Sequence, residues 1–347
     1  MITTDKSTPP SLSIIIPVYN AEQTLERCVA SIFRQGLLPY SFEVLLVNDG
    51  STDNSLSVCK LLASAHNEIK VIDKPNGGVA DARNRGLQEA AGQWVGFLDD
   101  DDYLLDNGYA IAFQPYCHRE DIDVIRYFSS YDTTPVLPIE TGIVSEGKVW
   151  DLLKAGKTFL PSFVWLQFYR RSYIIKHNIR FRNVAMFDDY VFASSVFLTN
   201  PYLLTVKANI IRYSVREGNG TSNRSIAYSR KVAHGAVEAN KILCDTAIKF
   251  NVRQDETLWN ALLASLNHGK RIGISRILSS RYSHKEYLVE RNLWHKTGYY
   301  PVVIQKGIAC TVMNWIMSYW IAYRFFSLLF NGIVEPYLMP ILRKRLR

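Results

Sequence analysis

Within its first hundred residues the chain alternates short apolar runs with amphipathic stretches, and this alternation restricts the fold more than any other feature. The apolar runs predict buried strands, and the stretches with helical periodicity predict helices between them. The runs are 12–18, 42–47, 69–72 and 94–98, and the helical stretches are 22–35, 53–65 and 79–90. Short connections in this order predict a mostly parallel sheet with helices on both faces. Ligands of such sheets bind at the carboxyl ends of the strands.

The later part of the chain has a different pattern. A strand is predicted at 123–131, residues 141–148 are rich in turn formers, and helical periodicity dominates near the C-terminus. We therefore expect an α/β domain over residues 1–225, followed by a mainly helical region over 226–347.

Charge is distributed unevenly along the 347 residues, whose net charge is +8. Residues 1–110 contain 8 Lys and Arg against 15 Asp and Glu, and the remainder contains 32 against 17, so the two parts carry −7 and +15. The acidic part suits a metal site, whereas the basic part suits phosphates, nucleic acid or an anionic membrane. Five scattered cysteines without a Cys-x-x-Cys pair, and a polar N-terminus, predict reduced thiols and a cytoplasmic location.

Four consecutive carboxylates, Asp99 to Asp102, directly follow the strand predicted at 94–98. They repel one another at neutral pH, and a divalent cation would relieve that repulsion. Residues two apart in an extended chain share a side, so Asp99 and Asp101 can converge on one ligand. The alternative interpretation is a solvated loop that caps a following helix.

Two further segments follow predicted strands. Asp49 lies at the end of a predicted strand, directly before Gly50, and its carboxylate could accept from a nucleobase N–H there. The alternative interpretation is a simple turn and helix cap. Gly77 and Gly78 precede a helix of small residues, from which Arg83 could reach a diphosphate. The glycine segment matches neither the P-loop nor the Gly-x-Gly-x-x-Gly pattern.

In this order and spacing, the motifs resemble those of family 2 glycosyltransferases of the GT-A fold. The resemblance covers residues 11–110. It rests on Pro17 to Asn20 with Glu22 beyond, Asn48 to Asp53, Gly78 to Gly86, and the Asp-x-Asp element of Asp99 to Asp102. Asn48 departs from the family pattern, in which many members have Asp, while Asp49 retains it.

The resemblance implies a Rossmann-like GT-A sheet and inverting transfer of a sugar from a nucleotide donor, usually a UDP-sugar, to a hydroxyl. It also implies a cation, Mn²⁺ or Mg²⁺, held by Asp101 together with Asp99. The residues implied in donor binding are Pro17, Tyr19, Asn20, Glu22, Asp49, Gly78, Arg83, Asp99 and Asp100.

Farther along, Met186 to Phe192 is similar to a Glu-Asp element of the family, whose second acid is the usual catalytic base. The resemblance therefore implies Asp189 as general base. Taken without it, Asp188 and Asp189 are an acid pair at a helix N-terminus. A later segment that includes Tyr213 and Arg216 resembles one near the donor diphosphate, which implies Arg216 in donor binding.

Near the C-terminus, residues 307–323 contain no charged side chain, and a second apolar run follows Arg324. Trp and Tyr residues of this region are types favoured at membrane interfaces, and the chain ends in a basic cluster, 343–347. We expect 301–347 to lie on the inner membrane with its basic end on anionic lipid. Packing on the catalytic domain and a true span are the alternatives.

These features together predict a glycosyltransferase of bacterial surface polysaccharide synthesis. The expected partners are a UDP-sugar, a glycan or lipid-linked acceptor and, peripherally, the cytoplasmic face of the inner membrane, but not nucleic acid. A nucleotidyltransferase, a basic nucleic-acid-binding protein and an inactive relative of the family are the alternatives.

Overall fold

A computed structural model describes five stretches of the chain: residues 10–38, 41–131, 141–214, 225–297 and 308–338. The chain forms two compact units, and each is described by itself. The first comprises Met1–Asn183 and Ser195–Arg216, and the second comprises Val184–Ser194 and Glu217–Arg347.

Four parallel strands form the first half of the sheet of the first unit. They are β1 (Leu12–Val18), β2 (Phe42–Asp49), β3 (Ile69–Lys74) and β4 (Trp94–Phe97). All four lie within two residues of the predicted runs, and every residue of β1 is buried. The side-by-side order is β3-β2-β1-β4, so the carboxyl ends of these strands meet along one edge.

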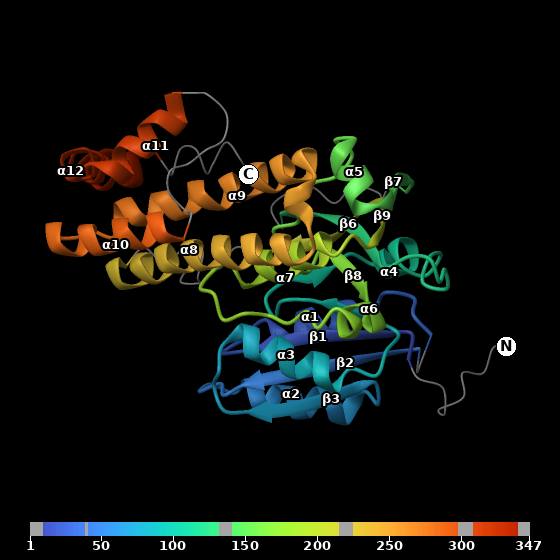
Figure 1. The fold of residues 1–347 in the computed structure, drawn as a ribbon. Helices are drawn as coiled ribbons and strands as arrows, with labels where there is room; N and C mark the ends of the chain where they lie inside the picture. Colours follow the sequence, from blue (N-terminus) through green and yellow to red (C-terminus); the bar gives the residue numbers. More distant parts are fainter. Residues whose placement is uncertain (1–9, 39–40, 132–140, 215–224, 298–307, 339–347) are drawn as a thin grey trace. The chain divides into compact units, whose positions relative to one another are not determined.

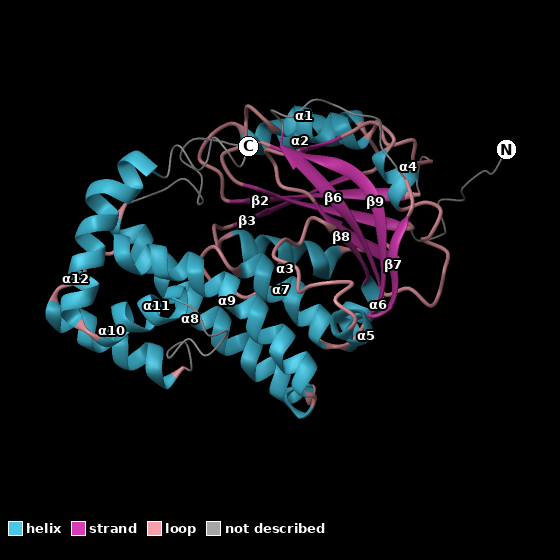
Figure 2. Cartoon of the chain, turned by 90° about the horizontal axis from the view of Figure 1, so that it is seen from above, coloured by secondary structure: helices cyan, strands magenta, loops and turns pink. Residues whose placement is uncertain are grey.

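The predicted helices connect these strands. They are α1 (Leu25–Ile32), α2 (Ser55–Ala65) and α3 (Val79–Glu89). Helices α1 and α2 cover one face of the sheet and α3 covers the other (Figure 2). Helix α1 is shorter than predicted because the residues before it form a turn that contacts the start of α2.

Strand β4 is the boundary at which the sheet changes direction, since it pairs in parallel with β1 and antiparallel with β8. The sheet continues in the order β4-β8-β6-β9-β5, and β7 also pairs with β9. Figure 1 labels strands β6, β7, β8 and β9 of this half. The additional strands are β5 (Tyr103–Leu104), β6 (Val124–Tyr131), β7 (Ile143–Lys148), β8 (Gln167–Arg170) and β9 (Tyr202–Tyr213). The prediction of a turn-rich segment at 141–148 is therefore wrong, because β9 pairs with most of it as β7.

Short helices connect these later strands. In the first unit they are α4 (Gly108–Ala112), α5 (Val149–Lys154) and α6 (Arg171–Lys176). Helix α7 (Asp188–Leu198) follows in the chain, and its residues up to Ser194 belong to the second unit.

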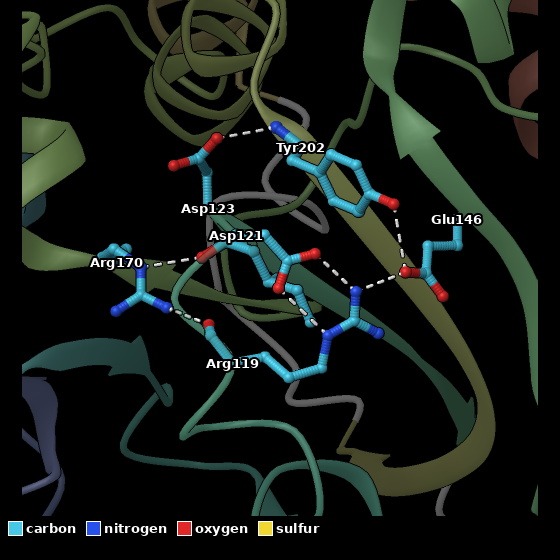
Figure 3. A network of polar contacts seen from close by, with 7 residues as sticks. Arg119, Asp121, Asp123, Glu146, Arg170 and Tyr202 are labelled. Carbon is cyan, nitrogen blue, oxygen red and sulfur yellow. Dashed lines mark hydrogen bonds and ion pairs between the residues drawn. The ribbon is translucent and has the colours of Figure 1, made fainter.

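A polar network joins the ends of the later strands (Figure 3). Arg119 forms ion pairs with Asp121 and Glu146, and the Tyr202 hydroxyl donates to Glu146. The contact with Arg119 holds the pKa of the Glu146 carboxyl below its usual value. Arg170 donates to backbone carbonyls of the same region, and its strand partner is the first residue of β4. The network therefore stabilises the sheet at the amino end of β4, opposite the polar turn that follows this strand.

The second unit is helical in its described part, as predicted. Its main helices are α8 (Ile226–Lys249), α9 (Glu256–Ser279), α10 (His284–Lys296), α11 (Ile308–Ser318) and α12 (Trp320–Leu329), with a 3₁₀ turn at Val252–Gln254 and a π-helical segment, η2, at Phe330–Leu338. Side chains of Ser225, Asp255 and Ser283 cap the first three of these helices. No helix in the described part of the chain has the length and apolar character needed to cross a bilayer.

Candidate functional site

The acidic turn, Asp99 to Asp102, follows β4 at the carboxyl edge of the parallel strands. An Asp99 carboxylate oxygen, Oδ1, lies 2.7 Å from Nη2 of Arg83. An Asp100 oxygen, Oδ2, accepts from the backbone N–H of Tyr19 at 3.1 Å, which ties the turn to the end of β1. The backbone carbonyl of Asp101 accepts from Arg27 Nη2 at 2.8 Å. Neighbouring elements thus position the turn through each of these three residues.

Asp102 has a different environment, since its side chain is only 1% exposed. Its Oδ1 accepts from the backbone N–H of Ser214, at the end of β9, over 2.8 Å. Its Oδ2 is buried and has no hydrogen-bond partner among the described residues. Burial, and then the charge of Asp99, raises the pKa of Asp102 to about 9, which favours the protonated form of this carboxyl.

A buried thiol lies beside the turn. The Cys28 thiol lies 3.4 Å from the carbonyl oxygen of Asp99. Burial raises its pKa well above the usual value, and the four carboxylates of the turn raise it further. A cation bound at this turn would therefore gain electrostatic stabilisation.

The turn fits a metal ion that is bound together with the donor. Its ligands are hard carboxylate oxygens, which Mg²⁺ and Mn²⁺ prefer. Within the described ranges, no cluster of three or more His, Cys, Asp or Glu side chains is arranged to hold a metal ion. Mg²⁺ in nucleotide-dependent enzymes is usually held by one or two carboxylates and completed by substrate phosphates. Asp99 and Asp101 can supply such a partial set.

At the end of β2, the buried carboxylate of Asp49 organises the glycine loop. It accepts from the backbone N–H groups of Gly77 and Gly78, at 2.9 and 2.8 Å, and pairs with Lys74. The adjacent Gly50 has φ +67° and lies so close to Asn76 that a Cβ would be 2.7 Å from its backbone nitrogen. The predicted donor residues Asp49 and Gly78 are thus in direct contact.

Asn20 and Glu22 hold the turn that leads into α2. Asn20, with φ +52°, accepts from the Thr52 backbone N–H through Oδ1 at 2.8 Å. Glu22 Oε2 accepts from the backbone N–H of Asn54 at 3.0 Å. The side chains of Asn20 and Glu22 therefore both accept hydrogen bonds from the loop that follows β2. Tyr19 is half exposed at the same edge.

Helix α3 places Arg83 next to the carboxyl edge of the parallel strands. The Arg83 side chain is nearly fully buried, and its guanidinium lies 5.4 Å from the centre of the Phe181 ring. The neighbouring Asn84 exchanges two hydrogen bonds with the backbone of Phe181, at 3.0 and 2.9 Å. Phe181 therefore fixes the part of α3 that directs Arg83 toward Asp99.

The other predicted residues belong to the second unit or lie outside the described residues. Asp188 and Asp189 begin α7 and belong to the second unit, where Asp188 is buried. Arg216 lies outside the described residues.

Sequence reasoning missed Arg27, Lys74 and Ser214, which complete the contacts of the acidic turn and of Asp49. Arg27 Nη2 donates both to the carbonyl of Asp101 and to Ser214 Oγ at 2.9 Å. Lys74 ends a strand that also contains Lys70 and Asp73, so its charge alone did not distinguish it. The contact of Arg27 with Ser214 joins residues 187 positions apart and leaves no local signal.

The chain is similar in sequence to known glycosyltransferases. The sequence profile of glycosyl transferase family 2 matches residues 13–176. The glycosyltransferase YibD of Escherichia coli is 27% identical over 234 residues, which are 63% of this chain and 67% of YibD. The glycosyltransferase EpsJ of Bacillus subtilis is 31% identical over 196 residues, which are 54% of this chain and 56% of EpsJ. The chain therefore spans just over half the length of EpsJ.

A solved structure shows the same fold. The crystal structure of S. aureus TarS 1–349 in complex with UDP-GlcNAc has a TM-score of 0.55 and is 17% identical, over 93% of this chain and 92% of that one. The predicted GT-A fold, a mostly parallel sheet with a helical C-terminal region, is thereby confirmed.

Proposed function

Since residues 13–176 form a glycosyl transferase family 2 domain, we propose that the chain transfers a sugar from a UDP-sugar to a hydroxyl of a glycan or lipid-linked acceptor, with inversion. The observation that carries this proposal is the acidic turn at the carboxyl end of β4, with Arg83 paired to Asp99. TarS, which shares the fold, was crystallised with UDP-GlcNAc, and this supports a nucleotide-sugar as donor.

On the donor side, the glycine loop held by Asp49 and the turn of Pro17 to Asn20 bind the nucleoside. Arg83 keeps Asp99 oriented toward the diphosphate. Asp101 and Asp99 would hold a Mg²⁺ or Mn²⁺ ion, which would neutralise the charge that develops on the leaving diphosphate. Arg216 adds positive charge to the diphosphate in this proposal.

On the acceptor side, Asp189 is the general base. The acceptor hydroxyl oxygen forms a bond to the anomeric carbon while the bond from that carbon to the diphosphate oxygen breaks. The hydroxyl proton passes to the Asp189 carboxylate, and UDP leaves with the bonding electrons. A single displacement of this kind inverts the anomeric centre.

We also propose a division of labour along the chain. Residues 11–110 bind the donor, 111–225 hold the acceptor and the base, and 226–347 support contact with a membrane. The enzyme then acts peripherally on the cytoplasmic face of the inner membrane in bacterial surface polysaccharide synthesis. The uneven charge supports this division, since residues 1–110 carry −7 and the remainder +15.

The base assignment is tested with Asp189→Asn, and Asp188→Asn is the matched control. UDP release is measured over a panel of nucleotide sugars with acceptor present, and UDP affinity is measured by calorimetry. We expect Asp189→Asn to abolish transfer and to retain UDP binding, while Asp188→Asn retains both. Equal loss of transfer and UDP binding in Asp189→Asn would contradict the assignment. Pyrophosphate release from UTP and a sugar phosphate would identify a nucleotidyltransferase instead.

The metal assignment is tested by UDP affinity with and without a chelator. In the unaltered chain we expect Mn²⁺ to tighten UDP binding, and in Asp101→Ala we expect affinity to be the same in both conditions. A donor affinity that does not change when the unaltered protein is chelated would refute the metal role.

A further inference from the structure

Helix α12 packs through a polar, hydrogen-bonded face. Ser327 Oγ donates to the carbonyl of Leu278 in α9 at 2.7 Å. The Tyr323 hydroxyl accepts from the backbone N–H of Tyr282 at 2.8 Å. Tyr323 and Ser327 are both buried, together with Ala322. Most surface helices show the reverse arrangement, in which the apolar face packs and the polar face meets solvent.

The opposite face of this region is apolar and exposed. Ile321 is 81% exposed, Phe325 61%, Leu328 63% and Ile333 51%. Their spacings of four, three and five residues keep them near one side of the helix and its continuation into η2. We group these four residues with the neighbouring Trp315 and Tyr319, which are 59% exposed and whose ring centres lie 6.3 Å apart, and call the six the outward face. Exposed apolar and aromatic side chains gathered in this way indicate a binding surface.

The charge of the surrounding sequence identifies what covers this face. From Arg291 to the C-terminus the chain carries eight Lys or Arg residues and one acid, Glu335. Exposed Arg324 stands within the outward face, with its guanidinium 5.6 Å from the centre of the Trp320 ring. Apolar side chains interspersed with Trp, Tyr and basic residues match the boundary between acyl chains and anionic headgroups. A second copy of the chain would place like charges against one another.

We propose that the outward face, Trp315, Tyr319, Ile321, Phe325, Leu328 and Ile333, binds an anionic lipid bilayer. This inference rests on the membrane contact proposed above and assigns it to one surface. The helix lies in the plane of the headgroups, its apolar side chains enter the acyl boundary, and Arg324 meets lipid phosphate.

The test is co-sedimentation of the full chain with phosphatidylcholine vesicles that contain or lack phosphatidylglycerol. Phe325→Asp is compared with Leu61→Asp, because Leu61 on α2 is also 61% exposed and the substitution is the same. We expect Phe325→Asp to weaken binding to anionic vesicles by at least about tenfold, and Leu61→Asp to leave it unchanged. Urea unfolding and UDP release with a soluble acceptor are the controls for folding. We expect both to be unaltered in Phe325→Asp and in Leu61→Asp.

Three results would overturn the inference. Unchanged vesicle binding by Phe325→Asp would mean that another surface is used, although membrane contact would stand. A wild-type chain that releases UDP without binding anionic vesicles would remove the membrane contact and leave the transferase proposal intact. A dimer in sedimentation velocity that Phe325→Asp dissociates, with no vesicle binding, would assign the outward face to self-association.

Discussion

Gly86 is the position where a single methyl group tests the packing beneath the proposed donor site. It lies in α3 against β1, and a Cβ built on it would be 2.4 Å from Cγ2 of Ile15 and 3.2 Å from Cγ1. Carbon atoms in contact are normally about 3.5–4.0 Å apart. Ile15 is fully buried and β-branched, so its Cγ2 cannot rotate away freely. Gly86→Ala must therefore move α3 away from the sheet.

The expected cost follows from two opposing effects. An extra methyl in a packed core costs about 1–3 kcal/mol. Alanine favours a helix over glycine by about 1 kcal/mol, which offsets part of that cost. We expect Gly86→Ala to lower the free energy of unfolding by about 1–2 kcal/mol. UDP binding should weaken as well, because α3 carries Arg83 to its 2.7 Å contact with Asp99.

Urea unfolding of the full chain tests this reasoning in two backgrounds. Ile15→Val keeps both γ carbons, so the penalty of Gly86→Ala should persist in it. Ile15→Ala removes them, so the penalty should vanish or become a gain of about 1 kcal/mol. An equal penalty in both backgrounds, or a stabilised Gly86→Ala single variant, would refute the steric argument.

Three further changes have defined outcomes. Asp102→Asn should change the free energy of unfolding by less than about 1 kcal/mol, because the amide is neutral like the protonated acid and can still accept from the Ser214 N–H. Asp102→Ala loses this hydrogen bond and should cost about 1–3 kcal/mol in urea unfolding. Asn84→Ala should cost about 1–3 kcal/mol, because two backbone groups of Phe181 lose their partners; no change in the urea midpoint would contradict this. The hydrogen bond to Glu290 raises the pKa of His234 above 6.5, so this pair stabilises the fold fully below pH 6.5 and the effect is lost as pH rises through the raised value. The unaltered protein should therefore have a higher free energy of unfolding than His234→Gln at about pH 5.5 but not at about pH 8.5. Urea unfolding at the two pH values measures this difference.

The first half of the fold was predictable because its signals are local. Strands β1 to β4 are apolar runs, and helices α1 to α3 have clear periodicity between them, so their order already implied a parallel sheet. The beginning of α1 was less predictable. Glu22 was assigned to the helix by its periodicity, but it accepts from Asn54 and belongs to the preceding turn.

The second half depends on pairing between distant segments. Strand β7 carries Gly147 and turn-forming residues, and only its partner β9 makes it a strand. The two-residue strand β5 likewise exists only through β9. In the site, the sequence marked Asp49 and Asp99 correctly as residues at strand ends, yet their partners Lys74 and Arg83 follow from tertiary packing.

Strand β9 also determines when the strands of this sheet can complete their pairing during synthesis. Among the described strands, β5 and β7 pair only with β9, and one edge of β6 also pairs with β9. None of these three edges can pair before β9 has been synthesised. Since β9 ends at Tyr213, a ribosome working at about 5–20 residues per second leaves these edges without their partner for several seconds. Unpaired strand edges are templates for association with other chains. The nascent protein is therefore most vulnerable to aggregation after β6 emerges and before β9 does, and holdase chaperones would act in that interval.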